Sequence, residues 1–170
     1  MNIRPARPRD AEAICEMINH TIRETLITFT TDLKTSAEVS AEITARGPAY
    51  LVAEEGAELM GFASFGPFRK GPGYAHTAEH SIQLRPEARG NGMGRALMMR
   101  LQDVAEAQGI HVLIAGISSA NPDSIGFHAQ LGFAEVARMP EVGRKCGQWL
   151  DLILMQKILS TDPDSTLSDR

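Results

Sequence analysis

Apolar residues recur with a helical period in four stretches of the chain. After Asp10, a candidate N-cap, one helical face carries Ile14, Met17, Ile18 and Ile22. A second helix is predicted over 36–46. A third is predicted over 92–108, closed by Gly109, with a buried stripe made of Met93, Leu97, Leu101 and Val104. A fourth begins at Asn121 as the cap, with Pro122 as the first helical residue, and ends at Gly132.

Strand patterns fill the segments between these helices. Residues 2–5 predict a short strand, and 49–55 with 58–68 predict a strand pair joined near Gly56. A strand over 76–84 is stopped by Arg85 and Pro86, and the continuous apolar stretch 111–118 predicts a strand covered on both faces. Two closing strands are predicted in 133–143 and 147–158. The order predicts an α/β domain with a mixed sheet, neither a Rossmann fold nor a barrel.

Length, charge and cysteine content narrow the class of protein. The 170 residues suit one domain, predicted over 1–159, and the polar segment 160–170 predicts a disordered tail. A net charge of −4 argues against a nucleic-acid partner. The sequence has no signal-peptide pattern and no stretch long enough to span a membrane, so we expect a cytosolic protein. Cys15 and Cys146 show no zinc spacing, and we expect buried or partly buried free thiols.

The stretch "EARGNGMGRALM" at 87–98 is the strongest candidate for a binding site. Three glycines at alternate positions, flanked by Arg89 and Arg95, follow a predicted strand and open a predicted helix. Glycines let a backbone wrap an anion closely, and a helix N-terminus favours negative charge. The spacing differs from a Walker A loop, from the dinucleotide fingerprint and from a kinase loop. Taken alone, the loop is explained equally well by a flexible turn without a ligand.

The segment Arg89-Gly90-Asn91-Gly92-Met93-Gly94 resembles the pyrophosphate loop of the GNAT superfamily of acetyl-CoA-dependent N-acetyltransferases. The stretch "NPDSIGFHAQLGF" at 121–133 resembles the second motif of that superfamily. The segments "GPF", "EHS" and "EVGRKCGQWLD" are similar to the phosphinothricin acetyltransferase group and its relatives that acetylate methionine sulfone and methionine sulfoximine. The resemblance spans residues 2–157.

This resemblance implies a mixed, mostly antiparallel sheet whose middle strands, 80–84 and 111–117, splay apart to admit acetyl-CoA. The backbone of Ile82, Gln83 and Leu84 would bind the pantetheine arm. The pyrophosphate would be held by the loop, that is by Arg89, Gly90, Asn91, Gly92, Met93, Gly94 and Arg95. Asn121 would bind the arm from the other side, act only as a helix cap, or do both. The resemblance implies a homodimer and no metal.

Glu79 is the candidate general base. It lies with Thr77, Ser81 and Gln83 on one side of a strand that we expect to be buried on both faces. The resemblance places the catalytic Glu of the group at this position, and partial burial would raise its pKa. A structural ion pair with an arginine is the alternative. His128 matches the group's histidine, either as proton donor to the leaving thiolate, as a second member of the proton path, or as a structural residue. His80 is expected to pack beside the site.

The resemblance also assigns an acceptor site for a small amino-acid-like molecule. The cation and the aromatic residue of that site match Arg69 and Tyr74. The backbone of Pro72 and Gly73 would contact the acceptor, and Phe29 would form an aromatic wall. Gly71, Cys146 and Gln148 depart from the group's pattern. The predicted reaction is direct attack of an α-amino group on the thioester of acetyl-CoA. Acetylation of a polyamine, antibiotic or protein amine, a CoA-binding module without catalysis, and a nucleotide-binding regulator remain the alternatives.

Overall fold

The computed structural model describes residues 1–159. Within them, seven strands form one sheet in the order β1-β2-β3-β4-β5-β7-β6. The strands are β1 Asn2–Pro5, β2 Tyr50–Glu55, β3 Glu58–Pro67, β4 Thr77–Leu84, β5 Val112–Ser118, β6 Ala134–Lys145 and β7 Gln148–Ile158. The α-helices are α1 Ala11–Glu24, α2 Ser36–Arg46, α3 Met93–Ala107 and α4 Pro122–Gln130. Each element predicted from periodicity is confirmed, with ends that move by a few residues.

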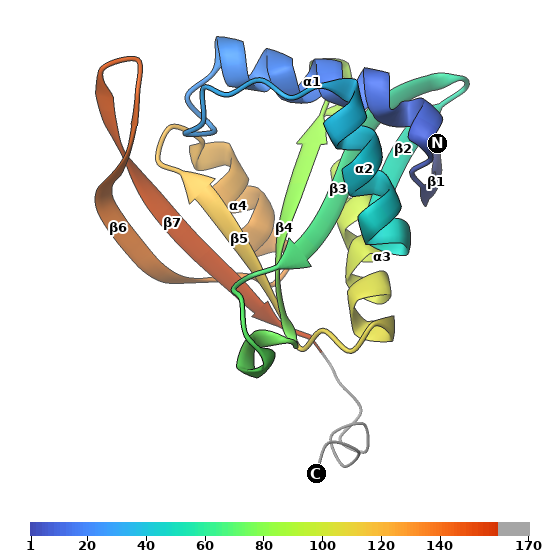
Figure 1. Ribbon diagram of the computed structural model, residues 1–170. Coiled ribbons are helices and arrows are strands. Elements are labelled where there is room, and N and C mark those ends of the chain that lie inside the picture. The colour runs from blue at the N-terminus through green and yellow to red at the C-terminus, as the bar shows by residue number, and fades with distance from the viewer. Residues whose placement is uncertain (160–170) are drawn as a thin grey trace.

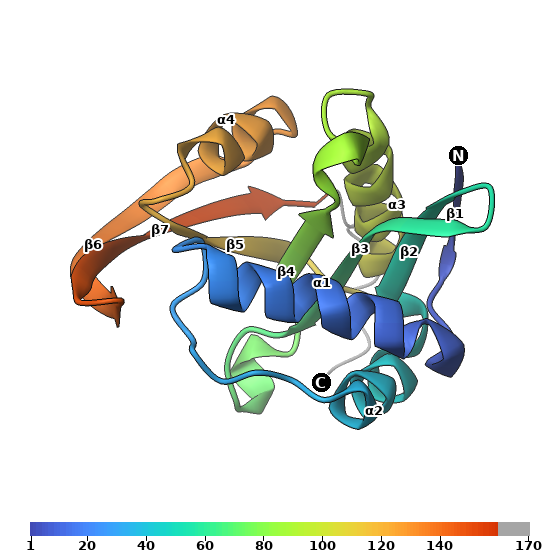
Figure 2. The ribbon, with the colours of Figure 1, turned by 90° about the horizontal axis from the view of Figure 1, so that it is seen from above.

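The helices cover opposite faces of the sheet, with α1 and α2 on one face and α3 and α4 on the other (Figures 1 and 2). The alternation along β2 explains this two-sided core, because successive side chains of a strand point to opposite faces. Tyr50 and Val52 pack with residues of α1 and α2, whereas Leu51 and Ala53 pack with residues of α3. Apolar burial on both faces fixes the register of the sheet.

The parallel pair β4–β5 is the one place where two central strands separate. Thr77 to His80 pair with Val112 to Ala115, and the remainder of each strand has no partner on the other. The other pairings in the described sheet are antiparallel. Backbone N–H and C=O groups of residues 81–84 therefore face a gap toward β5, where they need another partner. The predicted mixed sheet with splayed middle strands is confirmed.

Two burial expectations are wrong. Only one face of β4 is buried: Ala78 and His80 are covered by the side that carries α3 and α4, but Glu79 and Ser81 are exposed. The reason is that α1 and α2 pack mainly over β2 and β3 and leave this part of β4 open. Cys146 is exposed rather than buried, because Cys146 and Gly147, both with positive φ, form the tight turn between β6 and β7.

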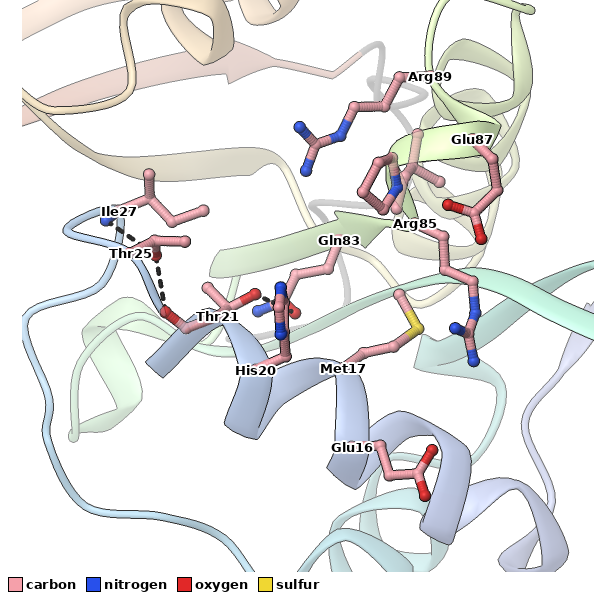
Figure 3. A pocket seen from close by; sticks show the side chains of 12 residues that line it. Glu16, Met17, His20, Thr21, Thr25, Ile27, Gln83, Arg85, Glu87 and Arg89 are labelled. Carbon is pink, nitrogen blue, oxygen red and sulfur yellow. Dashed lines mark hydrogen bonds between the residues drawn. The ribbon is translucent and has the colours of Figure 1, made fainter. Parts of the chain in front are cut away.

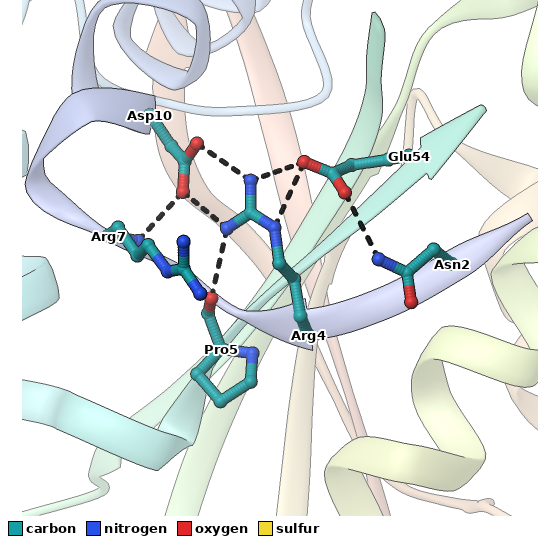
Figure 4. A network of polar contacts seen from close by, with 6 residues as sticks. All are labelled: Asn2, Arg4, Pro5, Arg7, Asp10 and Glu54. Atoms are coloured by element: carbon teal, nitrogen blue, oxygen red, sulfur yellow. Dashed lines mark hydrogen bonds and ion pairs between the residues drawn. The ribbon is translucent and has the colours of Figure 1, made fainter. Parts of the chain in front are cut away.

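The candidate cap Asp10 has a different role. It occupies the N-cap position of α1, but its carboxylate makes no capping bond to that helix. Instead it accepts from the Arg7 N–H at 2.7 Å and from both terminal nitrogens of Arg4, which also pairs with Glu54 (Figure 4). The hydrogen bonds from Arg4 hold the pKa of Asp10 and of Glu54 below the ordinary carboxyl range. This network ties β1, β2 and the start of α1 together.

We expect Arg4→Met to lower the free energy of unfolding by about 1 to 3 kcal/mol, because it strands the nearly buried Asp10 carboxylate. The matched control is Arg138→Met, which removes an exposed pair with Glu135 and should cost less than about 0.5 kcal/mol. A carboxyl group whose pKa is lower in the folded than in the unfolded state stabilises the fold at pH values above its unfolded pKa of about 4. That stabilisation is lost as the pH falls from this value toward the folded pKa. In urea unfolding, the gap between wild type and Arg4→Met should therefore shrink below pH 4; a constant gap contradicts the assignment.

Candidate active site

Glu79 lies on β4 between two glycines of the neighbouring strands. Gly66 of β3 is its antiparallel partner, and Oε1 of Glu79 leans over β5, 2.8 Å from where a Cβ on Gly116 would lie. Within residues 1–159, no ion pair reaches the carboxylate, so a structural pair with an arginine is not what holds it. Although the residue is exposed, the protein atoms around its carboxyl group partly desolvate it, and this raises the pKa of Glu79 above the ordinary value. An unpaired carboxyl group of raised pKa on an open face can act as a general base.

His128 lies on the opposite face of the sheet and is buried against His80. Its Nδ1 lies 2.7 Å from the carbonyl oxygen of Ser124, so Nδ1 carries the proton, and its Nε2 accepts from Nε2 of His80 at 2.9 Å. Both rings also contact Phe133. Burial lowers the pKa of His128, and burial together with the neighbouring His128 lowers the pKa of His80 to about 3.

These bonds bear on the predicted acid role of His128. Both ring nitrogens are engaged, and the neutral form is favoured, so His128 holds no proton ready for a leaving thiolate. The nitrogen without a hydrogen-bond partner among the described residues is Nδ1 of His80. The geometry favours the structural alternative, in which His128 and His80 join α4 to β4 at the last residue paired with β5. The expectation that His80 packs beside this position is confirmed.

A cavity of about 320 Å³ opens beside the unpaired end of β4 (Figure 3). Three predicted cofactor residues line it, Gln83 and Leu84 at the end of β4 and Arg89 in the glycine loop. The other lining residues come from α1, the segment after it and the segment that follows β4: Glu16, Met17, His20, Thr21, Thr25, Ile27, Arg85, Pro86 and Glu87. Thr21 Oγ1 donates to Gln83 Oε1 at 3.2 Å across the cavity floor.

The contribution of α1 to this cavity was missed from the sequence. Residues 16, 17, 20 and 21 share one side of the helix, because 16 and 20, 17 and 20, and 17 and 21 are three or four positions apart. His20, given no role from its sequence context, lines the cavity. The periodicity of α1 could have identified this second face, but nothing in the sequence shows that it meets the end of β4.

The glycine loop has the backbone geometry of an anion site. Gly90 and Gly92 have φ of +78° and +85°, and a Cβ on either would meet no atom within 4 Å. Gly92 is the N-cap of α3 without a side-chain capping bond, and the helical hydrogen-bond ladder starts at the Ala96 N–H. The earlier N–H groups therefore have no partner within the helix and, with the helix dipole, favour an anion in the open space. The Met93 N–H donates to Oδ1 of Asn91 at 3.1 Å.

Two residues of the loop differ from the prediction. Gly94 is buried, and a Cβ on it would lie 3.0 Å from Leu84 and 3.3 Å from Phe127, so this glycine allows α3 to pack closely on its neighbours. Arg95 points away from the first cavity: it lines a second one of about 190 Å³ and donates to the Gln130 carbonyl at 3.4 Å. Of the two flanking arginines, Arg89 alone lines the cavity beside β4.

The predicted acceptor residues form two separate groups. The Arg69 guanidinium lies 5.3 Å from the ring centre of Phe68, which Tyr74 meets edge-on at 6.5 Å. Pro72 and Gly73 belong to the same exposed short helix as Tyr74, next to β4. Phe29 lies elsewhere, with its ring 2.5 Å from where a Cβ on Gly143 of β6 would lie.

Phe68, which the sequence did not single out, is therefore the centre of the first group. The Phe68 N–H bonds to the Thr77 carbonyl, which extends the β3–β4 ladder beyond the Gly66–Glu79 pair and places Phe68 two residues from the partner of Glu79. Asn121 is the N-cap of α4, but its side chain makes no capping bond. The simple helix-cap role is therefore not what its side chain performs among the described residues.

Within residues 1–159, no cluster of three or more His, Cys, Asp or Glu side chains is arranged to hold a metal ion. No helix of that part of the chain combines the length and apolar character needed to cross a membrane.

Comparisons with known proteins identify the family of this chain. Residues 16–133 match the model of the acetyltransferase (GNAT) family. The chain is 42% identical to the L-amino acid N-acyltransferase MnaT of Escherichia coli (strain K12), over 97% of this chain and 99% of that protein. It is also 42% identical to the L-methionine sulfoximine/L-methionine sulfone acetyltransferase of Salmonella typhimurium, over 92% of this chain and 93% of the relative.

Among solved structures, a phosphinothricin acetyltransferase from Sinorhizobium meliloti in complex with acetyl-CoA is 33% identical and has a TM-score of 0.87, over 94% of this chain and 88% of that one. The family match over residues 16–133 includes β4, β5 and the glycine loop. The chain belongs to the GNAT family of N-acetyltransferases, enzymes that use acetyl-CoA.

Proposed function

We propose that this protein transfers the acetyl group of acetyl-CoA to the α-amino group of a small amino acid of the methionine sulfone, methionine sulfoximine or phosphinothricin type. The observation that carries the proposal is the unpaired Glu79 carboxylate, with its raised pKa, where β4 and β5 separate. The names of the relatives supply the acceptor class. Residues 1–159 would form a single acetyltransferase domain built on one sheet.

The described residues fit acetyl-CoA, which supplies an activated thioester carbonyl to the site. Unpaired backbone groups of Ile82, Gln83 and Leu84 would bind the pantetheine arm as a strand would, with the Asn121 amide on the other side. Gly90, Asn91 and Gly92, with the Arg89 guanidinium and the first N–H groups of α3, would hold the pyrophosphate. Met93, Gly94 and Arg95 would contribute backbone atoms at most, because Met93 and Gly94 are buried and the Arg95 side chain lies elsewhere.

Glu79 would take a proton from the acceptor ammonium, through water, and leave the neutral amine to attack the thioester carbonyl. As the C–N bond forms, the C–S bond would break, and the proton lost by the attacking nitrogen would end, by way of water, on the sulfur of the departing CoA. The backbone N–H groups of β4 near the split would stabilise the charge that develops on the carbonyl oxygen. Arg69 and Tyr74 would bind the acceptor beside Glu79, with Pro72 and Gly73 shaping the turn and Phe29 forming a more distant wall. His128 enters this mechanism as a positioning residue that acts through His80.

The direct test is release of CoA thiol from acetyl-CoA with a panel of acceptors. The panel contains L-methionine sulfone, L-methionine sulfoximine, phosphinothricin, the ordinary amino acids and polyamines. We expect turnover with the first three. Turnover with polyamines alone would overturn the acceptor class and keep the enzyme class.

We expect Gly92→Ala to raise the KM for acetyl-CoA about tenfold with a smaller change in kcat. The added methyl group enters the open space in which we expect the pyrophosphate. The left-handed φ at this position costs alanine about 1 to 2 kcal/mol, which disfavours the loop conformation that binds the anion. Gly56→Ala is the matched control, since Gly56 also has positive φ and open space but lies in the β2–β3 turn. Steady-state kinetics at varied acetyl-CoA checks this. If both variants have the same KM for acetyl-CoA, the glycine loop does not bind the cofactor.

We also propose that the protein is a homodimer of the cytosol. Strand β6 is the edge of the sheet, and β6 and β7 expose Val136, Met139, Val142 and Trp149 at 42 to 58%. Exposed apolar side chains along an edge strand favour association with a second copy. The free thiols of Cys15 and Cys146 suit a reducing compartment.

A further inference from the structure

Arg46, the last residue of α2, lies over the same face of the sheet as Glu79. Its Nη1 donates to Ser64 Oγ at 2.7 Å. The three atoms closest to where a Cβ on Gly66 would lie belong to its guanidinium group, at 3.7 to 3.8 Å. Gly66 is the direct antiparallel partner of Glu79, and such partners point to the same face. The Arg46 guanidinium therefore flanks Glu79 on the β3 side.

The Glu79 carboxylate leans in the opposite direction, over Gly116 of β5. The guanidinium thus lies over Gly66 on the β3 side of Glu79, while the carboxylate leans toward Gly116 on the β5 side, and neither neighbouring position carries a side chain of its own. Gly116 is two residues beyond Ile114, the partner of Glu79 on β5, so the two glycines lie about 10 Å apart across the sheet and about 7 Å apart along it, or about 12 Å in all. An α-amino acid with a hydrogen bond of about 2.8 Å at its ammonium and another at its carboxylate spans about 8 Å, which leaves room for one water beside Glu79.

Arg46 is held in place but only weakly neutralised. The nearest carboxylate oxygen is Oε2 of Glu42 at 3.9 Å, whereas Oε1 of Glu42 pairs with Lys34. The guanidinium lies 5.8 Å from the ring centre of Tyr50, and 34% of the side chain is exposed. A guanidinium has five N–H donors, and the described bond to Ser64 uses one. The others suit a carboxylate, which guanidinium binds with two parallel hydrogen bonds.

We propose that Arg46 binds the α-carboxylate of the acceptor while Glu79 receives the proton of its amine. This assignment rests on the proposed function and deepens it, because it restricts the acceptor to α-amino acids with a free carboxylate. Arg69, exposed beside Phe68, then serves the far end of the acceptor, where a sulfone, sulfoximine or phosphinate group carries oxygen acceptors. Amides and esters of the same amino acids are poor acceptors for the wild-type enzyme.

The test compares L-methionine sulfone with its amide as acceptors for wild type, Arg46→Gln and Arg46→Lys. We expect Arg46→Gln to raise the KM for the free acid about 10- to 100-fold, which is the usual contribution of a charged hydrogen-bond pair to affinity. The kcat of this variant should stay within about threefold of the wild-type value. The KM for the amide stays unchanged, and Arg46→Lys restores part of the loss. The matched control is Arg100→Gln, which removes a similar loose helical pair, at 3.9 Å from Asp103, on the opposite face.

Calorimetric binding of L-methionine sulfone in the presence of CoA, and the thermal midpoint of each variant, accompany the kinetics. Weaker binding of the free acid by Arg46→Gln at an unchanged midpoint supports the assignment. An unchanged KM for the free acid, or an equal rise for acid and amide, overturns the role of Arg46 alone. A wild-type enzyme that acetylates polyamines and no amino acid overturns the proposed acceptor class, and the role of Arg46 with it.

Discussion

The variant Glu79→Gln is expected to lower kcat by about 10²- to 10⁴-fold, the usual contribution of a general base, while acetyl-CoA still binds. The amide keeps the size of the side chain and its position over Gly116 but cannot accept the ammonium proton. Retained affinity for acetyl-CoA, measured as the rise in melting temperature that it causes, separates loss of the base from loss of the site. The fold is expected to tolerate the change, because Glu79 is exposed and makes no ion pair within residues 1–159.

The pH dependence of the wild type gives a second readout. A base works in its deprotonated form, so kcat/KM falls as pH drops through the pKa of Glu79. Because burial raises that pKa, this fall should lie above the ordinary carboxyl range of about 4.3. Glu58→Gln, which changes an exposed carboxylate at the start of β3, should leave both turnover and the profile unchanged. Full activity of Glu79→Gln would remove Glu79 from the mechanism.

The elements that the sequence predicted well are those whose information is local. The stripe of α3 and the Asn121, Pro122 and Gly132 signals around α4 depend on spacing and backbone conformation within a few residues. The same holds for Gly90 and Gly92, whose positive φ the structure bears out. Local chemistry was enough to predict where the helices start and where an anion could meet the backbone.

The features that the sequence did not reveal depend on which distant residues meet. Gly94 is close to the other glycines in sequence but faces Phe127 of α4, and Arg95 extends toward the end of the same helix. Nothing in the pattern of α1 shows that His20 lines a cavity with Gln83, 63 positions further on. Arg46 ends a helix that looks ordinary in sequence, and only the register of β3 and β4 brings it to Glu79. Such contacts follow from tertiary packing and leave no periodic signal.

The open face of β4 shows a further reason for such differences. A strand inside the sheet is expected to be covered on both faces, although the alternation of Thr77, Glu79, Ser81 and Gln83 with less polar residues is also the pattern of a strand with one open face. The polar residues on that side are the local sign of a binding surface. General rules of burial fail where function keeps a surface uncovered.

The His80–His128 pair leads to the second large effect. We expect His128→Ala to lower the free energy of unfolding by about 3 to 5 kcal/mol, because it opens a cavity in a packed region and leaves the His80 N–H without an acceptor. Under conditions where the variant is folded, kcat should stay within about tenfold of wild type, since a neutral, doubly bonded imidazole supplies no proton to the thiolate.

His76→Ala is the control for loss of an imidazole, because His76 is exposed, lines neither of the two described cavities, and its ring bonds the Gly109 carbonyl. Urea unfolding and kcat for both variants check the prediction. A fall in kcat of about 10²-fold or more at unchanged stability would restore His128 as the acid, since a general acid contributes about that much. A large loss of stability with modest loss of kcat would establish the pair as the link between α4 and β4. The asymmetry between the two faces of β4 would then follow: a buried, neutral pair orders the strand on one side, and a single exposed carboxylate performs proton transfer on the other.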